Sequence, residues 1–134
     1  MRGRLVSLCL VSLALVVTGL GLVGEHWQRK RQAWEGAATA THGDPLAGQG
    51  KVTAYGCGGC HQIPGVEGAS GQAGPSLKGF AGRTYVAGRL TNTPDNVQAW
   101  VAHPRQIDPQ TAMPELGLTR ADARDITAYL YTLR

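Results

Sequence analysis

The stretch that decides the fold is Cys57-Gly58-Gly59-Cys60-His61. It places two thiols three positions apart and an imidazole directly after the second thiol. At this spacing the thiols can reach the two vinyl groups of one porphyrin, and the next residue brings a nitrogen ligand under the iron. The pattern Cys-x-x-Cys-His is typical of covalent c-type haem attachment. We therefore predict one covalent haem c, attached through Cys57 and Cys60, with His61 as an iron ligand.

Two other chemistries also use paired cysteines. A structural zinc site needs four ligands, usually as two pairs, but the chain has three cysteines in all and His103 stands alone. A thioredoxin-like dithiol requires a βαβ setting, and no such pattern is visible. Gly58 and Gly59 favour haem because they carry no side chains that would obstruct a flat ring.

A second axial ligand is expected from Met113, the one methionine beyond the initiator. It lies in Thr111-Ala112-Met113-Pro114, in a segment that also contains Pro109 and Gly117. A methionine on such a loop is a better ligand than core filler, although core packing is the usual role of methionine. His103 is the alternative ligand, but it directly precedes Pro104 at a helix end, which favours a surface or capping position.

Composition limits the chain to one small domain plus a tail. It has 134 residues and a mass of 14.1 kDa, with 43% hydrophobic and 16% charged residues. These values exclude a large multidomain enzyme and a disordered chain. Nineteen glycines and one phenylalanine indicate a loop-rich domain with few aromatic core residues. A domain of about 90 residues often needs a metal, a cofactor or crosslinks for its stability, and three cysteines leave one over in any disulfide pairing.

The net charge of +4 arises mainly in the tail. Five basic residues precede residue 32, whereas residues 44–134 contain eight basic and seven acidic residues. The globular part is thus nearly neutral, so we expect no nucleic-acid partner.

The amino-terminal segment is predicted to anchor the chain in a membrane. Leu5–Gly24 contains no charge and no proline, and twenty helical residues span about 30 Å, the thickness of a bilayer core. A cleaved signal peptide is the alternative. We expect residues 1–24 to form a transmembrane helix or uncleaved signal, residues 25–43 a juxtamembrane segment with a flexible tether at 36–43, and residues 44–134 the domain.

The domain is predicted to be all-α, with about three to five short helices. Asp44-Pro45 and Thr93-Pro94 each combine an N-cap residue with proline at the first helical position. The helices they open are expected to end near Tyr55 and Ala102. Thr119-x-x-Asp122 resembles a capping box and opens a last helix that runs to the terminus. Gly48 is expected at a close helix crossing.

These residues resemble class I monohaem cytochromes c over about residues 44–134. Cys57, Cys60 and His61 match the attachment motif, Gly74-Pro75-Ser76-Leu77 the Gly-Pro-x-Leu loop, and Ala112-Met113-Pro114 the ligand loop. The resemblance implies a small helical fold around one haem, His61 and Met113 as metal ligands, and a hydrogen bond from the ligand histidine to the Pro75 carbonyl. Arg83 and Trp100 are expected to contact the haem propionates.

The segment Asn92–Asn96, with Trp100 and the later stretch Met113–Leu118, is similar to the cytochrome c domain fused to subunit II of caa3-type oxidases. The chain has no cysteines left for the dinuclear copper site of a complete subunit II. The resemblance therefore implies a haem carrier of that type rather than the subunit itself.

From these observations we expect single-electron transfer without a catalytic reaction or a small-molecule substrate. The expected circuit runs from a quinol-oxidising complex to a terminal oxidase, and the alternative is the electron-accepting subunit of a periplasmic dehydrogenase. Met113 argues against a peroxidase or gas sensor, because these need an open iron position. The expected location is the bacterial inner membrane, with the haem domain in the periplasm or at the cell exterior and the amino-terminal helix in lipid.

Overall fold

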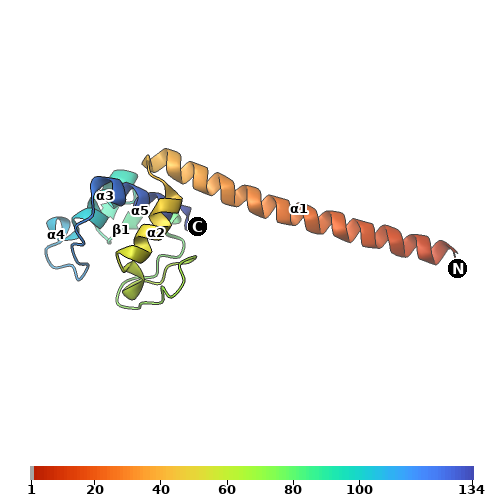
Figure 1. Cartoon of the computed structure of the whole chain (residues 1–134), viewed down its shortest axis with the longest axis horizontal. Coiled ribbons are helices and arrows are strands. Elements are labelled where there is room, and N and C mark those ends of the chain that lie inside the picture. Colours follow the sequence, from red (N-terminus) through yellow and green to blue (C-terminus); the bar gives the residue numbers. More distant parts are fainter. Residues whose placement is uncertain (1) are drawn as a thin grey trace. The chain divides into compact units, whose positions relative to one another are not determined.

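The computed structural model describes the backbone of residues 2–134 and the side chains of residue 10 and residues 13–134. The chain divides into two compact units, Met1–Gln32 and Ala33–Arg134. Helix α1 (Arg2–Thr41) accounts for the described residues of the first unit and continues into the second. The second unit contains α2 (Pro45–Ala54), α3 (Pro94–Ala102), α4 (Pro104–Ile107) and α5 (Arg120–Thr132), the 3₁₀ turns η1 (Cys57–Gly59) and η2 (Phe80–Gly82), and strands β1 (Tyr85–Val86) and β2 (Leu90–Thr91) (Figure 1). The prediction of a mostly helical domain is confirmed.

The predicted membrane span at residues 5–24 lies only partly within the described side chains. Residues 5–9, 11 and 12 of that span are outside them. Within the described part, no helix is both long enough and apolar enough to cross a membrane.

The last turns of α1 differ from the flexible tether predicted for residues 36–43. Residues up to Thr41 are helical, Ala37 and Thr41 are almost completely buried, and the Trp34 ring meets Tyr129 edge-on with centroids 6.4 Å apart. The Gln98 side chain also donates a hydrogen bond to the Thr41 carbonyl. Residues three and four apart share a helix face, so this face packs on the domain, and its burial outweighs the coil preference of the small residues.

Helices α2 and α5 cross closely at Gly48. A side chain there would overlap the Asp125 carbonyl and reach 2.9 Å from the Tyr129 Cβ. The predicted caps are present at both helices: Asp44 accepts from the backbone of α2, and Thr119 and Asp122 form a reciprocal capping box. The predicted close crossing is therefore confirmed.

Four side chains link these two helices in a polar network. Lys51 forms ion pairs with Asp122 and Asp125, Tyr55 donates to Asp122 over 2.9 Å, and Asp125 accepts from the Asp44 backbone over 2.8 Å. The hydrogen bond from Lys51 holds the pKa of Asp122 well below its usual range, with further contributions from Thr119 and Tyr55. The Asp122 carboxylate is therefore ionised at neutral pH, and the network as a whole joins α2 to α5.

The segment between η2 and α4 presents a short hairpin that the sequence did not predict. Strands β1 and β2 pair antiparallel in the register Tyr85 to Thr91 and Val86 to Leu90, and the turn has positive φ at Ala87 and Gly88.

Helix α3 begins at the predicted Thr93 cap and buries Val97 and Val101. After His103 the chain forms the single turn α4 rather than a loop.

Candidate functional site

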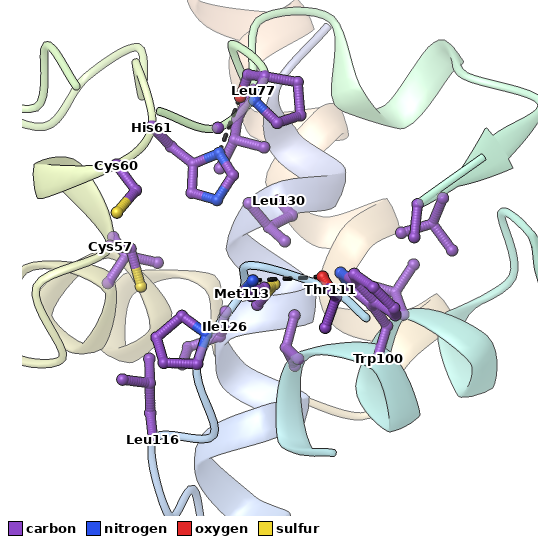
Figure 2. A pocket seen from close by; sticks show the side chains of 18 of the residues that line it. Cys57, Cys60, His61, Leu77, Trp100, Thr111, Met113, Leu116, Ile126 and Leu130 are labelled. Carbon is purple, nitrogen blue, oxygen red and sulfur yellow. Dashed lines mark hydrogen bonds between the residues drawn. The ribbon is translucent and has the colours of Figure 1, made fainter. Parts of the chain in front are cut away.

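A cavity of about 440 Å³ opens between α2, α3, α5 and the loops that precede and follow them (Figure 2). This volume is within the range of about 300–1,000 Å³ that is typical of ligand and cofactor sites. Most of its lining is apolar and belongs to the domain core, as seen for Val52, Leu77, Phe80, Val97, Ile126 and Leu130. The lining also includes Cys57, Cys60, His61 and Met113, so the fold brings the four predicted haem contacts to one cavity.

Cys57 begins the turn η1, which follows α2, and Cys60 caps the end of that turn. Gly56 enters the turn with a φ of 70°, a conformation that favours glycine, and the His61 amide closes it by donating to the Cys57 carbonyl over 3.0 Å. Burial raises the pKa of the half-buried Cys57 thiol, so it is protonated at neutral pH and lacks the thiolate of a reactive redox dithiol. A side chain at Gly58 would approach Ala69 to 2.7 Å, whereas none of the surrounding atoms restricts Gly59.

His61 is oriented by the loop at residues 74–77. Its Nδ1 lies 2.8 Å from the carbonyl oxygen of Pro75. Because a carbonyl oxygen only accepts, Nδ1 is the donor, and in the neutral tautomer with this donor the lone pair is on Nε2, the nitrogen then available to a metal. Gly74 packs directly on the ring, since a Cβ there would lie 2.6 Å from Nδ1 and 2.9 Å from Nε2.

Met113 reaches the cavity from the loop between α4 and α5. Its side chain is half-buried, and its backbone amide donates to the Thr111 hydroxyl over 3.2 Å (Figure 2). His103, the alternative ligand, does not line the cavity; its side chain is 54% exposed and lies 4.0 Å from Glu115. Of the two predicted candidates, only Met113 lines the cavity.

Arg83 and Trp100 both line the cavity. The Arg83 guanidinium donates to the carbonyls of Ser76 and Lys78 and lies 5.4 Å from the centre of the Phe80 ring. Arg83 therefore holds the loop that carries Pro75, a role that the sequence reasoning missed.

A family model described as Cytochrome c matches residues 46–134. The chain belongs to the cytochrome c family. It is also similar to cytochrome c oxidase subunit 2 of Alkalihalophilus pseudofirmus, with 32% identity over 108 residues. The match covers 76% of this chain but 31% of that protein, so the chain spans less than a third of the relative's length. No solved structure matches the chain. The predicted resemblance to monohaem cytochromes c, and to the domain of an oxidase subunit, is confirmed.

Membership of the cytochrome c family implies covalent haem c and electron transfer rather than catalysis. The residues at the cavity fit that group. The cavity has an apolar lining, two thiols on one turn, an imidazole with a free Nε2 lone pair, and a thioether from the later loop. Cys57, Cys60 and His61 also have the spacing of the Cys-x-x-Cys-His motif that attaches haem c.

Two polar residues that line the cavity, and a third, Asn92, that is not part of its lining, were not predicted from the sequence. Asp108 and Thr111 line the cavity beside Met113. Asn92 donates from its side chain to the carbonyls of Phe80 and Arg83 and accepts from the Tyr131 hydroxyl. The pattern Asp108-Pro109-Gln110-Thr111 indicates a turn, but no sequence signal indicates that this turn faces the cavity.

The substitution Gly74→Ala tests how tightly the ring of His61 is held. The added methyl group has no space beside the ring, so we expect the free energy of unfolding of the haem-bound protein to fall by about 1–3 kcal/mol. The Nδ1 proton resonance of His61 should also shift, because the bond to Pro75 is disturbed. Chemical denaturation and NMR measure the two effects.

Gly82→Ala is the matched control, since no atom lies within 4 Å of a Cβ at this exposed position. It should change the free energy of unfolding by about 0.5 kcal/mol or less. Equal effects of the two substitutions would contradict the tight packing of Gly74 on His61.

Proposed function

We propose that the protein is a membrane-anchored cytochrome c that carries single electrons to a terminal oxidase. The observation that carries this proposal is the meeting of Cys57, Cys60, His61 and Met113 at one apolar cavity. Two thiols would retain the haem permanently. Two axial ligands, His61 and Met113, would occupy both free positions of its iron, so that small ligands could not bind there easily.

Each of these residues has a distinct task in the proposed function. Cys57 and Cys60 hold the haem through thioether bonds, His61 supplies Nε2 and Met113 supplies its sulfur. The haem, when bound, supplies an iron that alternates between the ferric and ferrous states. The bond from His61 Nδ1 to the Pro75 carbonyl keeps the imidazole in one tautomer and raises its basicity as a ligand.

The surroundings favour fast transfer with little rearrangement. Buried apolar side chains of α3 and α5 line the cavity, and hydrogen bonds fix the loops that carry both proposed axial ligands. A methionine ligand raises the reduction potential relative to a pair of histidines. Arg83 and Trp100, which both line the cavity, are the residues that we propose would contact the haem propionates.

The membrane anchor is proposed from the charge-free run Leu5–Gly24. The attachment chemistry of c-type haem takes place outside the bacterial cytoplasm, so the domain would lie on the outer side of the inner membrane, with Arg2 and Arg4 inside. Anchoring confines the carrier to two dimensions and raises its effective concentration near partners in the same membrane.

The terminal oxidase is proposed as acceptor because the similar protein from Alkalihalophilus pseudofirmus is described as cytochrome c oxidase subunit 2. A quinol-oxidising complex is the matching donor. Redox partners of this kind form small and transient contacts.

The ligand assignment is tested by Met113→Ala. The variant should lose the weak sulfur-to-iron absorption at the red end of the oxidised spectrum, show a lower reduction potential, and bind carbon monoxide rapidly when reduced, because one iron position becomes open. The unsubstituted protein should bind carbon monoxide slowly or not at all.

Leu116→Ala is the control, since it shortens another half-buried apolar side chain of the same loop. It should keep the red absorption. An unchanged oxidised spectrum in Met113→Ala would show that Met113 is not the ligand.

The proposed partner is tested by electron delivery. The reduced full-length protein, mixed with its purified terminal oxidase, should be reoxidised rapidly in a reaction that cyanide blocks. Slow reoxidation, together with a stable dehydrogenase that remains bound after mild solubilisation, would replace this circuit with the dehydrogenase alternative.

A further inference from the structure

An ion pair joins the hairpin to the loop that carries Met113. The Nε of Arg89 lies 3.1 Å from Oδ2 of Asp108, although the two residues belong to separate segments of the chain. The Arg89 side chain is 57% exposed, whereas that of Asp108 is only 19% exposed and lines the cavity. The carboxylate is therefore partly shielded from solvent, which strengthens its attraction to the guanidinium relative to a fully exposed pair.

Hydrogen bonds within the loop link Asp108 to Met113 by way of Thr111. Its Oδ1 accepts from the Gln110 amide over 3.1 Å, and its carbonyl accepts from the Thr111 amide over 3.0 Å. The Thr111 hydroxyl in turn accepts from the Met113 amide over 3.2 Å. One carboxylate thus closes the turn, and the turn fixes the backbone position from which the Met113 side chain enters the cavity (Figure 2).

Arg89, at the other end of the ion pair, lies in the hairpin, whose backbone is fixed by hydrogen bonds. The Arg89 amide donates to the Val86 carbonyl over 3.1 Å, and Val86 is buried in the core with 5% exposure. The hairpin is closed further by the Asn92 amide, which donates to the Thr84 carbonyl over 2.9 Å. Arg89 is therefore held by a pair of strands that pack on the domain, not by a free loop.

We propose that the Arg89–Asp108 ion pair is a positioning brace, which holds the Met113 loop against the cavity and so keeps the methionine sulfur at the iron. The brace rests on the proposed function, because it assumes that Met113 is an axial ligand. Arg89 and Asp108 act through the loop backbone and touch no reacting atom. The other pair on this loop, His103 with Glu115, is wider and exposed on both sides, at 54% and 40%.

The brace is tested on the oxidised, haem-bound, full-length protein with two neutral variants. Arg89→Gln removes the cation, and Asp108→Asn removes the anion while it keeps an oxygen that accepts from the Gln110 amide. The first readout is the rate at which added imidazole replaces the sulfur ligand. This rate is measured as the loss of the sulfur-to-iron absorption at the red end of the spectrum. The second is hydrogen exchange of the Met113 amide.

Both variants should raise the imidazole rate and the Met113 exchange rate about two- to fivefold, the range that a partly exposed ion pair supports. The double variant Arg89→Gln with Asp108→Asn should raise both rates no further than either single variant does, because both substitutions break the same contact. Arg105→Gln is the matched control, because it removes the same charge from an exposed side chain on α4 for which the described part of the chain offers no ion pair.

Rates in Arg89→Gln and Asp108→Asn that equal those in Arg105→Gln would overturn the brace. Faster exchange at Met113 without faster imidazole binding would show that the ion pair holds the loop, but it would contradict the assignment of Met113 as a ligand and with it the brace as proposed. If Asp108→Asn does not fold, Arg89→Gln decides alone, because it leaves the hydrogen bonds of the turn in place: an increase in both rates supports the brace, and unchanged rates overturn it.

Discussion

The structure depends on the need to fill one apolar cavity in a domain that has few large side chains of its own. Val52, Phe80, Val97, Ile126 and Leu130 belong to the core, yet all five also face the cavity of about 440 Å³. Apolar side chains that line an unfilled space lose packing contacts on that side, which destabilises the folded state. The covalent haem of the cytochrome c family therefore serves as core as well as redox group, and the helices are arranged around its site.

Polar contacts around this cavity act mainly on the loops that carry ligands. Pro75 accepts from His61, and Arg83 holds the carbonyls of the same loop. On the other side, Asp108 and Thr111 organise the turn before Met113. Each proposed axial ligand stands on a loop with its own hydrogen bonds, so its position would change little between the oxidation states of a bound iron. Such rigidity suits electron transfer.

Local signals in the sequence were enough for most of the fold and for the centre of the site. The caps at Asp44, Thr93 and Thr119 depend on side chains within three residues, so they could be predicted without tertiary information. The same holds for Cys57-Gly58-Gly59-Cys60-His61. By contrast, residues 36–41 were predicted as a tether because small residues favour coil, whereas burial of Ala37 and Thr41 on the domain keeps them helical. The hairpin, the clamp by Arg83 and the pair of Arg89 with Asp108 also depend on residues distant in sequence, for which a single sequence carries no signal.

The most direct test of the central claim is the unfolding of the protein when haem cannot be attached. The double variant Cys57→Ser with Cys60→Ser, purified without haem, is compared by near-ultraviolet circular dichroism and calorimetry with the haem-bound protein. The account predicts that the colourless protein lacks fixed aromatic signals and shows no cooperative unfolding transition, while the haem-bound protein shows both. A colourless protein that is compact and unfolds in a sharp, cooperative transition would contradict it.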